Sequence, residues 1–162
     1  MSDKLYLVGG KPSKHFSWEE ICNNLTKNPM KFLDSPEARR HLRMMDDFRD
    51  YMATYIPVPF ATEGLVPTSW YRDEDFNREI GGAPNSAHLP ACASDIKNID
   101  TGNEILVTKA ITAWQVICMK YGVVGGIEIY PRGYQGSKRG LMHFDSVSDR
   151  FGTKVFRLKD NR

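Results

Sequence analysis

The chain has 162 residues, a formal net charge of +2 and 41% hydrophobic residues. This size and composition are typical of a single globular domain, here spanning residues 1–162. The balanced charge argues against a nucleic-acid-binding protein, because the basic cluster of Lys138 and Arg139 is too short to form such a surface. No apolar run approaches the ~20 residues that a membrane-spanning helix needs, so we expect neither nucleic acid nor a membrane among the partners.

The first residues and the cysteine content indicate where the protein is made. The start of the chain lacks the apolar stretch of a secretory signal. Its three cysteines, Cys22, Cys92 and Cys118, are scattered and odd in number, which does not indicate a disulfide framework. We therefore expect synthesis in the cytoplasm without a signal peptide. If the substrate lies outside the cell, another process must release the protein.

Two helices are predicted in the first third of the chain. One lies within residues 15–25, where Ser17 and Glu20 have the spacing of a capping box. The other begins after Ser35, because Pro36 suits the first helical position. Apolar side chains of this second helix recur at helical spacing and define a core face: Ala38, Leu42, Met45 and Met52.

A loop is predicted over residues 57–67, which contain three prolines and Gly64. Residues 68–88 after it suggest a short strand, then a turn and a loop. A third long helix is predicted over residues 103–122, with Gly122 as its C-terminal stop. Its core-facing side chains are Leu106, Ala110, Ala113, Trp114, Ile117 and Tyr121.

The last part of the chain contains three predicted strands, which start near residues 126 and 140 and cover residues 153–158. Each has period-two alternation or a composition rich in strand-forming residues. Helices first and hairpin-like strands last predict an α+β fold, with a mainly antiparallel sheet packed against helices.

His88 and Asp95 stand out because they lie among small residues, in the segment "GGAPNSAHLPACASD". They cannot share a regular helix, since Pro90 interrupts it. They cannot face the same way from one flat strand either, since their separation is odd. They converge only if the chain bends between them.

His143 and Asp145 are two residues apart, so they share one face of a predicted strand. His88, Asp95 and His143 could then surround one zinc ion, because imidazole and carboxylate are suitable ligands and catalytic zinc usually keeps three protein ligands. From spacing alone, ordinary surface or hydrogen-bonded histidines remain the alternative. Cys92 is interpreted as a small buried residue, with a fourth ligand or a nucleophile as the alternative.

Residues 69–96, "SWYRDEDFNREIGGAPNSAHLPACASDI", resemble the core of the zinc D-alanyl-D-alanine carboxypeptidases and their bacteriophage L-alanyl-D-glutamate endopeptidase relatives. Those proteins carry an arginine-bearing S-x-Y-R, then Ser-x-His-x-x-Gly-x-Ala-x-Asp, and later a His-x-His or His-x-Asp strand. The matching residues of the central signature are Ser86, His88, Ala93 and Asp95, and "MHFDS" supplies the later strand. The resemblance extends from about Phe16 to about Val147 and implies the DD-peptidase/hedgehog-like zinc fold.

The resemblance also implies roles for individual residues. His88, Asp95 and His143 would hold zinc, and Arg72 would bind or polarise the substrate near the scissile amide. Ser86 is expected either to orient His88 or to act as a plain turn residue. The rim of the site would be shaped by Asn77 and the turn "GGAP", in which Gly81 and Gly82 allow unusual backbone angles.

Two departures from the family pattern matter. The signature glycine is Ala91 here. Many relatives carry a general-base glutamate three residues before the last ligand, where this chain has Gly140, and others carry a histidine five residues before it, where this chain has Lys138. The base must therefore come from elsewhere.

Asp145 is the first candidate for the base, because its side chain lies beside His143 on one strand face. Glu128 is the second, since a neighbouring strand could bring it to the site. Asp145 could equally orient His143, a common role beside zinc.

The function implied by the resemblance is a zinc metallopeptidase that hydrolyses amide bonds in peptidoglycan stem peptides, as carboxypeptidase or endopeptidase. Such an enzyme, encoded by a bacteriophage, would act on the cell wall during lysis or from the virion. The alternative is a catalytically inactive zinc-binding module of the same fold, acting in binding or virion assembly. The oligomeric state is not predicted.

Overall fold

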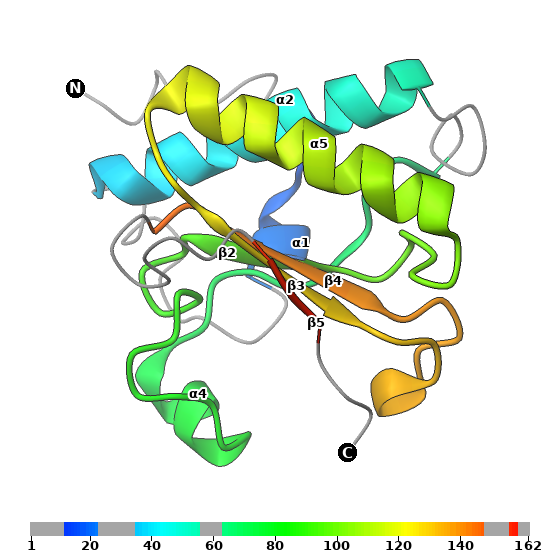
Figure 1. Ribbon diagram of the computed structural model, residues 1–162. Coiled ribbons are helices and arrows are strands. Elements are labelled where there is room, and N and C mark those ends of the chain that lie inside the picture. Colours follow the sequence, from blue (N-terminus) through cyan, green and yellow to red (C-terminus); the bar gives the residue numbers. More distant parts are fainter. Residues whose placement is uncertain (1–11, 23–34, 56–62, 148–155, 159–162) are drawn as a thin grey trace.

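A computed structural model describes residues 12–22, 35–55, 63–147 and 156–158 (Figure 1). Its helices are α1 (Trp18–Ile21), α2 (Pro36–Tyr55), α4 (Glu74–Glu79) and α5 (Glu104–Tyr121), with a short 3-10 helix over Tyr134–Gly136. Its strands are β1 (Pro67–Ser69), β2 (Ala93–Ile96), β3 (Gly126–Tyr130), β4 (Leu141–Asp145) and β5 (Phe156–Leu158).

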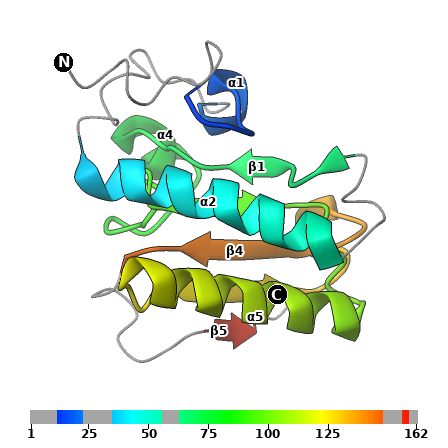
Figure 2. The same ribbon diagram turned by 90° about the horizontal axis from the view of Figure 1, so that it is seen from above.

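The strands form one sheet in the order β1-β2-β4-β3-β5. β2 pairs antiparallel with β1 and β4, β4 pairs antiparallel with β3, and the edge strand β5 runs parallel to β3. Helices α2 and α5 lie side by side across one face of the sheet, and α4 lies on the other side (Figures 1 and 2). This architecture confirms the predicted α+β class, with a mainly antiparallel sheet packed against helices.

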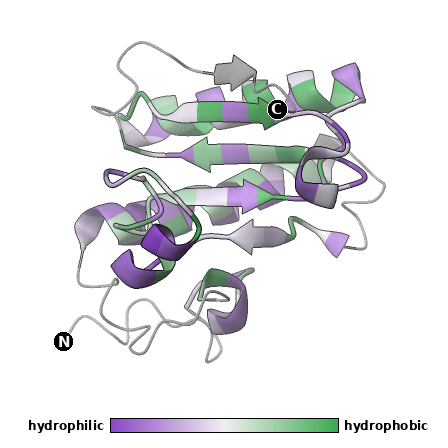
Figure 3. Ribbon diagram, turned by 90° about the horizontal axis from the view of Figure 1, so that it is seen from below, coloured by the Kyte–Doolittle hydropathy of each residue, from purple (hydrophilic) through white to green (hydrophobic). Residues whose placement is uncertain are grey.

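The hydrophobic core fills the space between the two long helices and the sheet. Met142 and Phe144 of β4 are fully buried there, and the Phe144 ring lies 4.7 Å from Phe48 and 5.5 Å from Trp114, centroid to centroid. Because successive strand residues face opposite sides, His143 points to the other face of the sheet. Figure 3 shows that face from below, with hydrophilic residues recurring along the strands.

The predicted helix ends are confirmed where the structure describes them. Ser17 and Glu20 form the capping box of α1, with Ser17 Oγ accepting from the Glu20 amide at 3.2 Å; residues 23–25 of that prediction lie outside the described part. Asn103 caps α5 by accepting from the Leu106 amide at 3.1 Å. Gly122 ends α5 in the left-handed conformation, with φ 70°.

Two short elements were missed by the sequence analysis. The strand predicted after residue 68 is confirmed as β1, but the turn and loop predicted after it were wrong, because Glu74–Glu79 form helix α4. Asp73 caps this helix by accepting from the Phe76 amide at 2.8 Å. Strand β2 was not predicted, because four residues are too few to show a clear period.

The predicted loop and the last predicted strand lie partly outside the described residues. Residues 57–62 of the loop and 153–155 of the strand fall there, whereas Phe156–Leu158 form β5 as expected. Among the described helices, none combines the length and the apolar character needed to cross a bilayer.

Candidate metal centre

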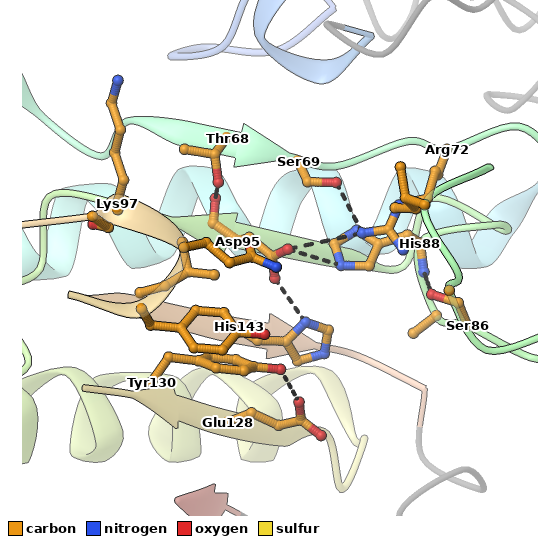
Figure 4. A pocket seen from close by; sticks show the side chains of 18 of the residues that line it. Thr68, Ser69, Arg72, Ser86, His88, Asp95, Lys97, Glu128, Tyr130 and His143 are labelled. Atoms are coloured by element: carbon orange, nitrogen blue, oxygen red, sulfur yellow. Dashed lines mark hydrogen bonds and ion pairs between the residues drawn. The ribbon is translucent and has the colours of Figure 1, made fainter. Parts of the chain in front are cut away.

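Three side chains from two strands and one loop meet on the face of the sheet opposite the long helices (Figure 4). Asp95 on β2 and His143 on β4 are directly paired neighbours in the ladder. His143 Nδ1 lies 2.9 Å from Asp95 Oδ1, and His88 Nε2 lies 3.3 Å from Asp95 Oδ2. One ligand atom from each of the three residues lies within 4.8 Å of the others, which is close enough for the three to reach a shared cation.

The bend that brings His88 toward Asp95 is centred on Ala91. Its φ of 57° is in the left-handed region, which non-glycine residues rarely adopt. The amide of Ala91 donates to the His88 carbonyl at 3.1 Å, and the amide of Cys92 donates to the Ala87 carbonyl at 2.9 Å. The chain therefore turns tightly and then enters β2 with Asp95 facing the site.

A backbone hydrogen bond sets the orientation of the His88 ring. His88 Nδ1 lies 2.8 Å from the Trp70 carbonyl oxygen, and since a carbonyl only accepts, Nδ1 carries the proton. Nε2, the other ring nitrogen, faces Asp95 Oδ2 at 3.3 Å. These two atoms are close enough to bind one cation together. A metal-binding histidine commonly donates its other N–H to a carbonyl in this way.

His143 lies between two carboxylates. Besides the contact with Asp95, its Nε2 lies 3.4 Å from Asp145 Oδ2. Burial by itself lowers the pKa of His143, but Asp145 and Asp95 outweigh burial and raise it to about 10. Burial raises the pKa of Asp95, yet His88 and His143 together hold it well below its usual range. The two imidazoles and the carboxylate are thus a donor set that fits zinc.

Asp145 lies behind His143 rather than in front of it. It is fully buried, and its Oδ1 accepts from the Val147 amide at 3.2 Å. It is not among the residues that line the cleft in front of the three ligands. Asp145 is therefore placed to hold the Nε2 proton of His143, which leaves Nδ1 for a metal.

The cleft in front of the candidate ligands has a volume of about 1180 Å³. Glu128 lines it and pairs directly with His143 across the β3–β4 ladder. Tyr130, two residues further along β3, donates from its hydroxyl to Glu128 Oε2 at 2.7 Å. The structure thus places Glu128, and not Asp145, on the wall of the cleft.

Arg72 also lines the cleft, and two polar contacts hold its guanidinium. Nη2 donates to Ser69 Oγ and Nη1 to Asn77 Oδ1, both at 3.1 Å. Nη2 lies 3.9 Å from Asp95 Oδ2, so the positive charge is directed toward the candidate metal ligands. Asn77 is itself anchored, because its side-chain Nδ2 donates to the Ala83 carbonyl at 2.9 Å.

Gly82 is the glycine of the rim that this arrangement requires. A Cβ at this position would collide with Asn77 Oδ1 and would lie 3.2 Å from Arg72 Nη1. Gly81 has φ 70° but no atom within 4 Å of such a Cβ. Asn77 and the "GGAP" turn are therefore placed to shape the rim, with Gly82 making room for the contact between Asn77 and Arg72.

Ser86, Cys92 and the remaining histidines take different positions. Ser86 lines the cleft, and its hydroxyl accepts from the His88 amide at 3.3 Å. Cys92 is buried and does not line the cleft. His15 lies at the surface with Nε2 2.6 Å from Asp50. His41 is fully buried between two serine hydroxyls, one each from the β2 and β4 segments.

Several residues of the site gave no usable signal in the sequence. The Trp70 contribution is a backbone carbonyl, which any residue type supplies. Tyr130 supports Glu128 through spacing along a strand, which a search for acids and histidines alone overlooks. Ser69 belongs to the "S-x-Y-R" segment, and its contact with Arg72 explains why a hydroxyl stands there.

Comparison with known families adds one finding. A family model described as Peptidase M15 matches residues 14–125, which is more than half of the chain. The matched range includes Arg72, His88 and Asp95 but ends before β3 and β4, so it does not cover His143, the third candidate ligand. Comparisons with curated proteins and with solved structures returned no match.

Proposed function

Since the chain belongs to the Peptidase M15 family, we propose that it is a zinc metallopeptidase that hydrolyses amide bonds in peptidoglycan stem peptides. The observation that carries the proposal is the convergence of His88, Asp95 and His143, whose ligand atoms lie within 4.8 Å of one another on the wall of a cleft of about 1180 Å³. The family is zinc-dependent, and the donor set suits zinc.

Different residues of the chain have different roles around the reacting amide. A zinc ion at such a site supplies Lewis acidity and lowers the pKa of a water molecule toward about 7. Arg72 is placed to stabilise the negative charge that develops on the amide oxygen, because its guanidinium is held by Ser69 and Asn77 and points at the ligands. A guanidinium fixed before the substrate binds requires little reorganisation during the reaction.

Glu128 is the general base that we propose. It lines the cleft directly beside His143, whereas Asp145 lies behind the imidazole and serves to orient it. The position used by many relatives is closed to a side chain here: Gly140 has φ 78°, and a Cβ there would collide with Thr101 Oγ1 and lie 2.5 Å from the Tyr130 carbonyl oxygen. A glutamate at residue 140 is therefore excluded by this backbone.

The proposal is tested by purifying the protein with zinc and following the release of amino groups from cell-wall fragments. Removal of zinc by a chelator is expected to abolish release, and Glu128→Gln to lower it at least ~100-fold with zinc retained. Asp145→Asn is instead expected to weaken zinc binding roughly 10- to 100-fold. The exposed Glu104→Gln is the matched control. Unchanged release from the metal-free protein would end the proposal.

A zinc-binding module without catalysis is the second candidate, favoured by the absence of an acid at position 140. It predicts that the zinc-loaded protein binds cell-wall fragments without releasing amino groups, and that Glu128→Gln leaves this binding intact. Hydrolysis that depends on Glu128 would exclude it.

A further inference from the structure

One end of the cleft carries a group of positive side chains that the proposed chemistry does not use. Lys97, Lys138 and Arg139 all line the same cleft as the three candidate ligands. The strand register places them at one edge of the sheet: Ile96 pairs with Met142, so Lys97 follows β2 where β4 begins. Lys138 and Arg139 precede β4, with Gly140 between Arg139 and the strand. Figure 4 shows Lys97 at the opposite end of the view from His88 and Ser86.

The distance from the metal ligands to this end is short. Lys97 is two residues beyond Asp95, and its amide donates to the Val66 carbonyl at 3.1 Å, which continues the pairing beyond β1 and β2. At ~3.3 Å per extended residue, the Lys97 backbone lies roughly 7 Å from that of Asp95, and both residues line the cleft. A peptide cleaved at the ligands would therefore reach Lys97 within one or two residues.

The backbone that carries Arg139 is fixed. Its carbonyl accepts from the Thr101 amide at 2.8 Å, and Arg132 in the same β3–β4 connection pairs with Asp100 through two contacts of 2.7 and 2.6 Å. These contacts attach the connection to the segment before α5. The positive end of the cleft is thus held in place before any ligand arrives.

Among the described residues that line this end of the cleft, positive side chains outnumber acidic ones. Arg139 Nη1 lies 3.4 Å from Glu63 Oε2, and Glu63 is the acidic residue of the cleft lining at this end. Within the described ranges, neither the Lys97 nor the Lys138 ammonium has an acidic partner within 4.0 Å. A cleft wall with an excess of one charge sign concentrates ligands of the opposite sign.

We propose that Lys97, Lys138 and Arg139 form a subsite for a substrate carboxylate that lies one or two residues from the scissile amide. This rests on the proposed peptidase function and adds a selectivity to it, for acidic over amidated peptides. Two sources of the carboxylate share this chemistry: the α-carboxylate of a γ-linked glutamate, and the terminal carboxylate of the peptide.

The test uses the zinc-loaded protein and the synthetic peptide L-Ala-γ-D-Glu-L-Lys-D-Ala in three forms. One form is unmodified, one has the glutamate α-carboxylate amidated, and one has the terminal carboxylate amidated. Binding is measured by calorimetry and cleavage by amino-group release. Removing the recognised carboxylate is expected to weaken binding roughly tenfold, since each exposed charge contact changes an equilibrium only a few-fold. Raising the salt concentration should reduce this difference.

The variant Lys97→Gln/Lys138→Gln/Arg139→Gln is expected to bind the acidic and the amidated peptide equally. Lys120→Gln is the matched control, because Lys120 is exposed on α5 and paired with Asp47 away from the cleft; it should keep the full preference. Equal binding of all three peptides by the unmodified protein would overturn the inference, as would a preference that survives in the triple variant. Preferential binding of the acidic peptide without cleavage would support the subsite and overturn the peptidase proposal. Cleavage without a preference for the acidic peptide would support the peptidase proposal and overturn the subsite.

Discussion

Ala91 carries the backbone conformation on which the candidate site depends. An L-residue with φ 57° is strained by roughly 1–2 kcal/mol, and relatives have glycine at this position of the signature. The side chain is fully buried, so the methyl group contributes packing that offsets part of the strain. The small side chain explains how the bend between His88 and Asp95 persists without glycine.

His143 is expected to make zinc binding sensitive to pH. Without a metal its pKa is raised to about 10, so at neutral pH the ring holds a proton on each nitrogen. A metal on Nδ1 must displace one of them. We predict that zinc binding at neutral pH releases about one proton and that zinc affinity rises as the pH approaches 10.

Calorimetric titrations of zinc in buffers of different ionisation enthalpy measure this proton. His15→Gln is the control, because His15 lies at the surface and contacts Asp50. Zinc uptake with no proton release would show that His143 is not a ligand through Nδ1.

At the residue scale, the sequence could suggest the candidate ligands but not the base. His88, Asp95 and His143 differ from other polar residues through spacing and family resemblance, and the structure places them together. Asp145 and Glu128 could not be ranked from sequence, because the ranking depends on which carboxylate faces the cleft. Only the cross-strand register and the burial of Asp145 separate them.

At the level of elements, α4 and the rim after it act as one support for Arg72. Gly82→Ala would force Asn77 away, since the new Cβ collides with Asn77 Oδ1, and Arg72 would lose that contact. We predict a fall in kcat/KM of about 10- to 100-fold with zinc retained, because small displacements of a positioned group are costly.

The matched variant is Gly81→Ala. It introduces strain at φ 70° but meets no atom within 4 Å, so it is expected to lower the free energy of unfolding while sparing kcat/KM. Equal losses of activity in both variants would argue against a specific role for the Asn77 contact.

His41 joins α2 to both ligand-bearing strands. Its Nδ1 lies 2.9 Å from Ser146 Oγ and its Nε2 lies 2.9 Å from Ser94 Oγ, and the ring is fully buried. Burial first, and the nearby His88, His143 and Arg40 charges in addition, lower the pKa of His41 well below its ordinary value. The folded protein therefore keeps this ring neutral.

This burial makes the fold sensitive to acid. Below pH ~6.5 the unfolded chain protonates His41 while the folded chain does not, so the unfolded state binds more protons and stability falls. We predict that the free energy of unfolding of the metal-free protein decreases from pH 6.5 to 4, by at most ~1.4 kcal/mol per pH unit from this residue. Denaturant titrations at several pH values measure the slope.

Neither His143 nor Asp95 accounts for a loss of stability between pH 6.5 and pH 4. The stabilisation from the raised pKa of His143 is fully present below its ordinary value and is lost only as the pH rises toward 10. The stabilisation from the lowered pKa of Asp95 is lost only below its ordinary value of 3.8. His41→Gln is the control and should flatten the slope; an unchanged slope would contradict the assignment.

The long elements could be predicted and the short ones could not. Helix α5 has a cap at each end and a continuous apolar face, so several signals agree. α4 has six residues and β2 has four, which are too few for periodicity to distinguish helix, strand and loop. β2 forms because β1 and β4 pair with it on both sides. Its formation therefore depends on tertiary contacts and not on the local sequence.

At the scale of the whole molecule, the long helices α2 and α5 occupy one face of the sheet and the cleft the other. The order of helices and strands along the chain was sufficient to predict this class, since one apolar face of the sheet must be covered. The parallel pairing of β5 at the edge leaves no mark in the sequence, because a strand pattern does not specify its partner.

Zinc is expected to stabilise the fold as a whole, because the candidate ligands come from the loop before β2, from β2 itself and from β4. A ligand that binds only the folded state adds about 4 kcal/mol at a thousand-fold excess over its dissociation constant. We predict that zinc raises the Tm and that a chelator reverses the rise. Asp95→Asn should show a much smaller rise. A rise of equal size in that variant would place the stabilising metal elsewhere.

The tetrapeptide Ser69–Arg72 supports a candidate metal ligand and the candidate substrate-binding arginine at once. Its Trp70 carbonyl orients His88, the Arg72 amide donates to the His88 carbonyl at 3.1 Å, and Ser69 holds the guanidinium. A shift of this short segment would disturb the orientation of His88 and the position of the Arg72 guanidinium together. During evolution, the loss of Arg72 and the loss of His88 should therefore occur together. Related sequences that keep only one of these two residues should be rare.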